Sequence, residues 1–355
     1  MPRPLLLTND TALLDDLLRL AAAAGAEADV ADHPAVAAPL WRAAPFVVLG
    51  REHVLALDSS LLPRRPGVVV LGAALDDVTV WRQAMERGAE HVLFLPDAEA
   101  WLLDRFADCT GTARRALVVA SVGARGGAGA TSFAVAFALA AVRAGYRTIL
   151  ADVDAYGGGI DLAFGTERVD GPRWDAFLGG PPPLSGEALA SVLPRYGELT
   201  VLAWPRAVAP VVPAPLVASM LSTCRRGADV LVLDVPRSFD ETCRTALDVA
   251  DVAFVVCPAE VRALASGRRV AETVSMFVDD VRCVVRGPAH TELPPEVAAA
   301  TLQVEYAGWL AAEKGIERAF DQGRPPGLRG RGPLARFCDG LVAGLVPGGA
   351  REPAP

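Results

Sequence analysis

Short apolar runs alternate with amphipathic stretches along the first hundred residues. Glycine or proline closes most of the runs that are short enough to be strands, which span residues 3–8, 27–32, 45–50, 67–72 and 91–96. Residues 13–25 and 80–89 carry the mixed apolar and charged pattern of surface helices. Alternating strands and helices of this length predict a parallel sheet that helices cover on both faces.

The second half of the chain repeats this alternation with longer and more apolar strand segments. Residues 116–122 form a predicted strand, a glycine-rich segment follows, and residues 131–145 form a predicted helix. Further apolar strands lead into aspartates near residues 152 and 234. The fold class expected from this order is α/β, with two doubly wound, mostly parallel sheet domains in succession.

We expect the two sheets to belong to separate domains. The chain has 355 residues, which is enough for two domains of ordinary size. A predicted helix that runs into a short linker separates the two halves. The expected boundaries are a first domain over residues 1–105, a linker over 106–115, a second domain over 116–346 and a disordered tail over 347–355.

Composition narrows the class of protein. Hydrophobic residues make up 52% of the chain and charged residues 21%, which indicates packed cores and not a disordered chain. No apolar run reaches the ~18 uncharged residues of a membrane-spanning helix, and the N-terminus turns acidic too early for a signal peptide. Six singly scattered cysteines indicate reduced core thiols in a cytoplasmic protein. A net charge of −8 argues against a surface built for nucleic acid.

The glycine-rich segment after residue 122 is the first candidate for chemistry. A strand, a glycine-rich loop and a helix follow one another here, which is the context that a phosphate-binding loop requires. Small residues let backbone N–H groups surround phosphate oxygens at a helix N-terminus, where the helix dipole favours anions. The residues expected to hold the phosphates of a nucleotide are Gly126, Gly127, Ala128, Gly129, Ala130, Thr131 and Ser132.

Carboxylates end two of the predicted strands in this half. Asp152 and Asp154 follow one apolar strand, and Asp234 ends another. Carboxylates at such positions can hold Mg²⁺ or orient an attacking water. The hydroxyl of Thr131 is placed to contribute to the same Mg²⁺ site.

The order of elements in the first half resembles a response-regulator receiver domain. A working receiver needs an acidic pair after its first strand, a phosphoacceptor aspartate, a hydroxyl and a lysine after later strands. Asn9 and Asp10 keep part of the acidic pair, whereas Gly50, Gly72 and Leu95 stand at the other three positions. Two interpretations remain open: a pseudo-receiver that docks partners, or a structural α/β domain with no partner.

Four segments of the second half, taken in order, resemble the motifs of the MinD/ParA ATPases. They are "RGGAGATS", "ILADVDAYGGGID", "VLVLDVPR" and "VVCPAEVRA", which resemble the deviant Walker A motif, switch I, the Walker B motif and the strand that follows. The resemblance spans roughly residues 116–345. With the receiver-like half in front, the chain looks most like the CpaE/TadZ branch of pilus-assembly localisation proteins, and within it like actinobacterial septum-site-determining, CpaE-like proteins.

This resemblance implies a cofactor, partners and a place in the cell. The family binds ATP or ADP with Mg²⁺ and forms a homodimer that meets face to face around two ATP molecules. Protein partners would belong to a septum or to a secretion or pilus assembly, and the cytoplasmic protein would be recruited to the septum or the pole. Attachment to the membrane would be only peripheral or through partners, and DNA is not an expected partner.

Carried over by position, the match is uneven. Arg125 stands where the family's signature lysine reaches across the dimer, and a guanidinium can still bind phosphate through two N–H groups. Ala130 replaces the lysine that contacts the β- and γ-phosphates. Thr131 with Asp152 or Asp234 would hold Mg²⁺, and Asp154 would be the catalytic switch I carboxylate. Arg286 stands where many relatives carry an asparagine for the adenine ring.

The missing lysine leads us to expect a degenerate ATPase that acts as a scaffold. Losing one transition-state contact costs on the order of 3 kcal/mol, or ~10²-fold in rate. Binding suffers less, because the loop N–H groups and Mg²⁺ remain. Two alternatives stay open: a slow, active ATPase in which Arg125 substitutes for the lysine, and a nucleotide-free structural dimer.

Three further features each have two interpretations. Arg324, Arg329 and Arg331 suggest a DNA-binding patch or, as we favour, a solvated loop. Apolar residues at helical spacing over 334–346 form either a membrane-targeting helix or, as the lack of basic residues favours, the last helix of the domain. Trp174 and Trp204 are either exposed for partner docking or buried against the sheet.

Overall fold

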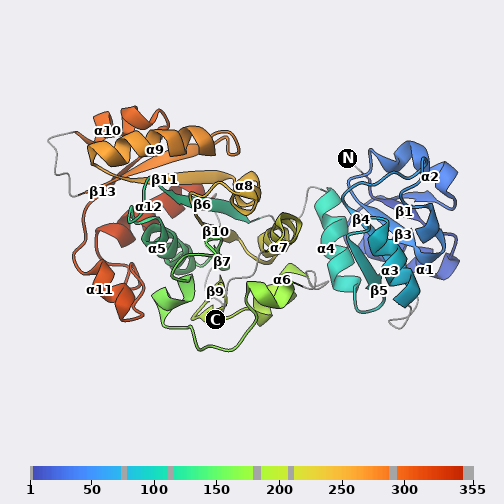
Figure 1. Ribbon diagram of the computed structural model, residues 1–355. Helices are drawn as coiled ribbons and strands as arrows, with labels where there is room; N and C mark the ends of the chain where they lie inside the picture. The colour runs from blue at the N-terminus through green and yellow to red at the C-terminus, as the bar shows by residue number, and fades with distance from the viewer. Residues whose placement is uncertain are drawn as a thin grey trace. The chain divides into compact units, whose positions relative to one another are not determined.

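The computed structural model describes residues 3–72, 78–110, 116–178, 185–206, 212–287 and 294–346. Contacts between Cα atoms divide the chain near residue 115 into two compact units, each with its own sheet and helices (Figure 1). The expected α/β fold class is confirmed. Residues 111–115 of the expected linker and the whole expected tail lie outside the described residues.

The N-terminal unit is built on a five-stranded sheet in the order β2-β1-β3-β4-β5, with every pair parallel. This is the strand order of doubly wound, flavodoxin-like sheets. All five strands were predicted, and their bounds are β1 Leu5–Leu7, β2 Asp29–Ala31, β3 Val47–Gly50, β4 Val68–Gly72 and β5 His91–Phe94.

Helices cover both faces of this sheet, because alternate residues of its strands enter two separate cores. The helices are α1 Thr11–Ala23, α2 Pro34–Trp41, α3 Val78–Glu86 and α4 Glu99–Thr110, with a 3₁₀-helix η1 at Arg51–Ala56. The sequence analysis predicted α1 and α3 but missed α2. That helix contains Pro39 and carries no charged residue, so it shows no amphipathic pattern.

The last helix of the unit extends beyond the boundary expected at residue 105. Helix α4 continues to Thr110, and Phe106 is fully buried in the N-terminal core. Its ring packs edge-on against Phe46, with 6.1 Å between the ring centroids. The first domain therefore includes residues that the sequence analysis assigned to the linker.

The C-terminal unit contains an eight-stranded sheet in the order β13-β12-β11-β6-β10-β7-β9-β8. Only the short edge strand β8 runs antiparallel to its neighbour, so the expected mostly parallel sheet is confirmed. The strands are β6 Leu117–Gly123, β7 Thr148–Asp152, β8 Arg195–Tyr196, β9 Leu199–Leu202, β10 Val230–Val235, β11 Val252–Pro258, β12 Val281–Arg286 and β13 Glu305–Leu310.

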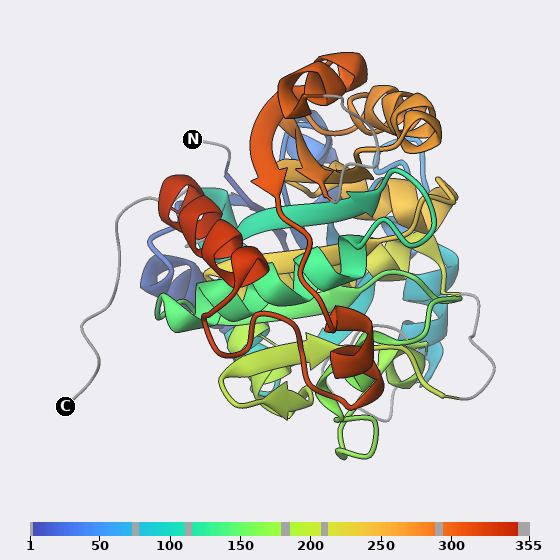
Figure 2. The same ribbon diagram turned by 90° about the vertical axis from the view of Figure 1, so that its left-hand side faces the viewer.

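Helices α5 and α12 lie side by side against this sheet (Figure 2), and α7, α8 and α9 pack on β10 and β11. The helices of the unit are α5 Ala130–Arg143, α6 Gly186–Val192, α7 Ala214–Gly227, α8 Glu241–Asp248, α9 Val261–Val274, α10 Pro295–Leu302, α11 Ile316–Asp321 and α12 Pro333–Leu345, with 3₁₀-helices η2 Ile160–Phe164 and η3 Trp174–Phe177.

The structure decides between several interpretations that the sequence left open. Helix α12 packs its apolar side on α5 and the core, as expected for the last helix of the domain. Trp174 and Trp204 are both buried and stack on each other at 5.4 Å between ring centroids. The six cysteines are all buried. Within the described residues, no helix has the length and apolar character needed to cross a membrane.

Phe106 provides a test of the extended first domain. Replacing Phe106 with Ala should destabilise the N-terminal unit by about 3–5 kcal/mol, because the change removes a ring from a filled core. Hydrogen exchange of peptides from β3 and α4 during urea unfolding of the full chain measures this locally. Leu55→Ala, at a side chain that is 62% exposed, is the control and should change stability by less than about 0.5 kcal/mol. Unchanged protection in Phe106→Ala would show that α4 is not part of the unit's core.

Candidate functional site

The glycine-rich loop follows the central strand of the C-terminal sheet. Strand β6 pairs with β10 on one side and β11 on the other, and α5 begins directly after the loop. Gly127 and Gly129 have φ angles of +71° and +94°, a backbone conformation that glycine adopts without strain. Gly129 is the N-cap of α5, so the loop lies at the N-terminus of the helix, which is the positive end of the helix dipole.

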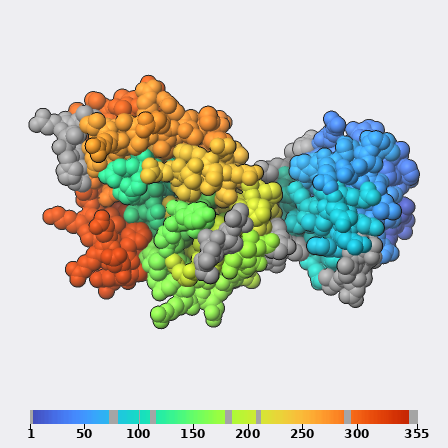
Figure 3. All heavy atoms as spheres, in the orientation of Figure 1, coloured from blue at the N-terminus to red at the C-terminus, as the bar shows by residue number. Residues whose placement is uncertain are grey.

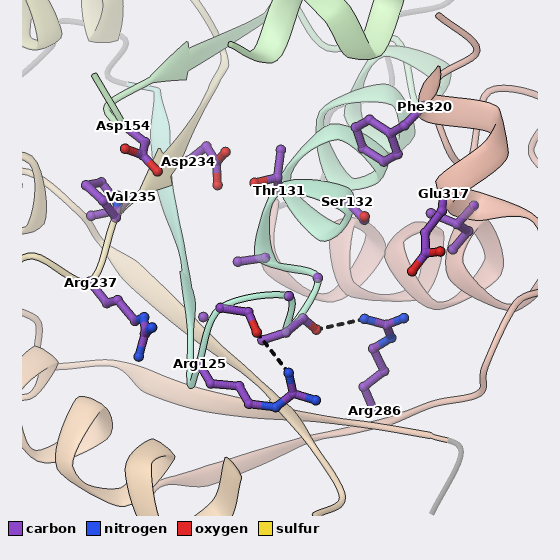
Figure 4. Close-up of a pocket in the computed structure, with 18 of the residues that line it drawn as sticks. Arg125, Thr131, Ser132, Asp154, Asp234, Val235, Arg237, Arg286, Glu317 and Phe320 are labelled. Atoms are coloured by element: carbon purple, nitrogen blue, oxygen red, sulfur yellow. Dashed lines mark hydrogen bonds between the residues drawn. The ribbon is translucent and has the colours of Figure 1, made fainter. Parts of the chain in front are cut away.

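A cavity of about 1150 Å³ opens over this loop. Every residue expected from the sequence to bind phosphate lines it. Asp154 and Asp234 lie toward one end of the loop, with Thr131 beside them, and Arg286 approaches from another side (Figure 4). In the space-filling view the green surface of the loop lies between the orange surface around α9 and α10 and the red surface of the C-terminal segment (Figure 3).

The three aspartates differ in what their carboxylates bind. Asp234 is almost completely buried and lines the cavity beside Thr131. Asp152 is also buried, but its two carboxylate oxygens accept the N–H groups of Asp154 (3.0 Å) and Ile160 (2.9 Å). Asp154 is partly exposed, and its Oδ1 accepts the N–H of Tyr156 at 3.1 Å. The geometry therefore favours Asp234 over Asp152 as the carboxylate on the metal side.

Burial makes these carboxylates difficult to ionise. Burial, with a smaller contribution from the nearby Asp154, raises the pKa of Asp234 to about 7, although the Thr131 hydroxyl opposes the shift. Burial and the nearby Asp234 together raise the pKa of Asp152 well above its usual range. A cation bound between Thr131 and Asp234 would relieve this unfavourable concentration of carboxyl groups.

Mg²⁺ fits this site only together with a phosphate ligand. Among the described residues, no group of three or more His, Cys, Asp or Glu side chains is placed to hold a metal. Mg²⁺ in phosphate sites needs only one or two protein ligands, with phosphate oxygens and waters completing its coordination. Thr131 and Asp234 meet that requirement.

Two arginines contact the loop through its carbonyl oxygens. Arg125, the residue at the signature position, donates to the carbonyl of Gly126 at 2.9 Å and to both carboxylate oxygens of Glu260 at 3.0 and 2.9 Å. Arg286, at the end of β12, donates to the carbonyl of Ala128 at 3.0 Å. Ala130 contributes no charge to the cavity.

The sequence analysis missed one whole wall of the cavity. Glu313, Glu317, Phe320 and Asp321 line it from the segment after β13 and from α11. These residues form no motif. The strand β13 could have indicated this wall. It is parallel to β12, and because ligands of such sheets bind outside the carboxyl ends of the strands, the segment that follows β13 is expected to lie near the site.

The matching edge of the N-terminal sheet is filled by side chains. Asp10 caps α1 by accepting the N–H groups of Ala12 and Leu13. Glu52 Oε1 accepts the Thr8 hydroxyl at 2.5 Å and the N–H of Asn9 at 3.0 Å. A β-carbon at Gly50 would lie 2.3 Å from that same oxygen. The position of a phosphoacceptor is therefore closed.

Two curated relatives from Mycobacterium tuberculosis match most of the chain. "Uncharacterized protein Rv3660c" from strain ATCC 25618 / H37Rv is 35% identical over 328 residues, which are 90% of this chain and 91% of the relative. "Uncharacterized protein MT3760" from strain CDC 1551 / Oshkosh matches with the same figures.

The chain belongs to the Rv3660c-like family. Its N-terminal unit matches the description "Rv3660c-like, CheY-like N-terminal domain" over residues 7–117. The receiver-like fold expected for the first half of this Rv3660c-like chain is thus confirmed.

Solved structures show the fold of the C-terminal unit. A ParA family ATPase from Chlorobium tepidum has a TM-score of 0.59 at 14% identity, covering 66% of this chain and 100% of that chain. MinD from Pyrococcus horikoshii, complexed with Mg-ADP, has a TM-score of 0.55 at 15% identity, covering 64% and 95%. MinD in the Aquifex aeolicus MinC:MinD complex has a TM-score of 0.55 at 20% identity, covering 64% and 96%. This Rv3660c-like chain therefore has the MinD/ParA fold.

The raised pKa of Asp234 predicts how stability depends on pH. The folded protein keeps a proton on Asp234 up to about pH 7, whereas the unfolded chain releases it near pH 4. The resulting contribution to stability is complete below pH 4 and is lost as the pH rises through 7. Asp234→Asn, which stays neutral, should therefore stabilise the metal-free C-terminal unit at pH 8 by on the order of 2–4 kcal/mol, with little effect at pH 4.

Urea unfolding at the two pH values, followed by hydrogen exchange of peptides from β6 and β10, measures this difference. Asp248→Asn removes a carboxylate that is exposed at the end of α8 and serves as the matched control. An Asp234→Asn gain that is the same at both pH values would contradict the assigned titration.

Proposed function

We propose that this protein is a nucleotide-binding positioning regulator of the MinD/ParA type. It holds ATP or ADP with Mg²⁺ at the loop of residues 126–132, dimerises through that face, and localises a septum or a pilus or secretion assembly from the cytoplasm. The observation that carries the proposal is the placement of Thr131, at the N-terminus of α5, beside the buried Asp234. It joins a phosphate-binding loop to a metal-side carboxylate within one cavity.

Each part of the cavity has a role in this function. Backbone N–H groups of the loop bind the phosphates, and Thr131 and Asp234 hold the metal. Mg²⁺, when bound, neutralises part of the phosphate charge. Asp154 lies close enough to this end of the cavity to orient a water, because it lines the same space as Thr131 and Asp234. Asp152 holds the loop after β7 in place by accepting hydrogen bonds from the backbone N–H groups of Asp154 and Ile160.

Weak hydrolysis follows from the two motif positions at which relatives carry a lysine. Ala130 provides no charge for the β- and γ-phosphates, and the guanidinium of Arg125 is paired with Glu260 of its own chain. Phosphoryl transfer depends on such charges more strongly than binding does. The protein then works mainly as a nucleotide-dependent scaffold.

One observation supports a second candidate, a slow but active ATPase. The side chains of Arg125 and Glu260 are 38% and 37% exposed, and pairs as accessible as this one contribute only about 0–1 kcal/mol. Arg125 can therefore leave Glu260 at small cost and reach the nucleotide of a second copy. A nucleotide-free structural dimer remains the outcome if no nucleotide binds.

The N-terminal unit would recruit the partner. Glu52 occupies the space beside Gly50, where a phosphoacceptor would stand. This supports docking of a partner, and not phosphotransfer, as the role of the unit. MinD is found in a MinC:MinD complex, and by analogy we propose a protein partner here. Assignment to the CpaE/TadZ branch and to the septum is part of this proposal.

Titration with a fluorescent ATP analogue and Mg²⁺ tests nucleotide binding. The unchanged protein should bind saturably in the micromolar range, and Asp234→Ala should lose most of the Mg²⁺-dependent affinity because the metal-side carboxylate is gone. Asp248→Ala is the control and should bind as the unchanged protein does. Absence of binding up to millimolar nucleotide would refute nucleotide regulation and leave the structural dimer.

Introducing a lysine at Ala130 tests whether the rest of the residues needed for ATP hydrolysis are present. Ala130→Lys places an ammonium at the start of α5 and should raise ATP turnover by on the order of 10²-fold, which is the typical worth of one transition-state contact. Steady-state phosphate release measures it, and the double variant Ala130→Lys with Asp154→Ala is the control that should remain slow. A rate that does not change in Ala130→Lys would show that other parts of the catalytic machinery are also missing.

A further inference from the structure

Arg286 reaches the phosphate-binding loop from a strand that is distant in sequence. It ends β12, and its Nη1 donates to the carbonyl of Ala128 at 3.0 Å across 158 residues of chain. A β-carbon at Gly129 would lie only 2.6 Å from this nitrogen. The guanidinium therefore lies directly against the turn of the loop that begins α5, as Figure 4 shows.

The charge of Arg286 is available to a ligand. Arg125 is paired with Glu260, whereas Arg286 makes no ion pair with any residue that the structure describes. A guanidinium carries five N–H donors, and the hydrogen bond to Ala128 uses one of them. The side chain is partly buried and lines the cavity, so the remaining donors can be offered to a bound anion.

We propose that Arg286 supplies the phosphate-binding charge that Ala130 does not, so that the loop is completed by a cation from β12. The inference rests on the proposed nucleotide site. The hydrogen bond to the Ala128 carbonyl holds the guanidinium against Gly129, at the turn that begins α5. From there it binds a phosphate oxygen through charge-assisted hydrogen bonds.

The alternative role for Arg286 is recognition of the base. Its place against Ala128 and Gly129 favours phosphate, because these residues belong to the turn whose backbone N–H groups face the anion. A guanidinium has only donors, so it could donate to the adenine ring nitrogens but could not accept the hydrogen bond that the adenine amino group offers, as an asparagine side chain can.

Inorganic pyrophosphate separates the two roles because it has no base. We would measure binding of Mg²⁺-pyrophosphate and Mg²⁺-ATP to the full-length protein by calorimetry. Arg286→Ala should lower the affinity for both ligands by about 10- to 100-fold, which is the usual effect of losing a charged hydrogen bond. Arg268→Ala removes an exposed arginine from α9 that pairs with Glu272, and both affinities should stay within about twofold.

A second substitution tests directly whether the guanidinium of Arg286 takes the place of the missing lysine. If Arg286 replaces the missing lysine, Ala130→Lys in the Arg286→Ala background should recover at least about tenfold of the lost pyrophosphate affinity. Arg286→Gln keeps a donor for the Ala128 carbonyl without the charge, and it should be as weak as Arg286→Ala. Circular dichroism of each variant confirms that it is folded.

Distinct results would overturn the inference or the proposed function. Arg286→Gln with unchanged affinity for both ligands would overturn the inference and leave the nucleotide site standing. Weaker ATP binding with unchanged pyrophosphate binding would assign Arg286 to the base and also overturn it. An unchanged protein that binds neither ligand would refute the proposed function, and the inference with it.

Discussion

The parallel pairing of β6, β10 and β7 is the constraint on which the site depends. Its register sets Asp234 opposite Ser121 on one side and opposite Asp152 on the other. All three strands end at the same edge of the sheet, so the loop after β6 and the aspartates at the ends of β10 and β7 must meet there. A shift of this register would separate Thr131 from Asp234 and leave the loop without its carboxylate.

Charge is distributed unevenly around that edge. The buried Asp152 and Asp234, with Asp154 beside them, concentrate carboxyl groups at the end of the loop where Thr131 lies, and a bound cation would favour their ionised form. The positive end of the α5 dipole and Arg286 occupy the rest of the loop. A phosphate with its metal ion matches this arrangement, because the anion meets the loop and the cation meets the carboxylates.

The two units show how parallel α/β sheets of the same general class can have different outcomes at the carboxyl edge. In both, polar residues follow parallel strands at the carboxyl edge of the sheet. In the N-terminal unit Glu52 and Phe94 fill the space beside Gly50 and Gly72, and Asp10 is used to cap a helix. In the C-terminal unit the loop of glycines leaves a cavity open. An open site therefore requires small residues at the edge as well as the fold.

The sequence by itself determined the fold class, the five strands of the first sheet and the strands of the second sheet that lead into the loop and the aspartates. Apolar runs ending in glycine or aspartate marked the strands, and the loop before Thr131 marked the phosphate site, because these features are local. The tertiary structure decided the rest. The pairing of Arg125 with Glu260 spans 135 residues, and the contact of Arg286 with Ala128 spans 158. Such contacts depend on which strands become neighbours in the sheet, and no local pattern of residues encodes that order.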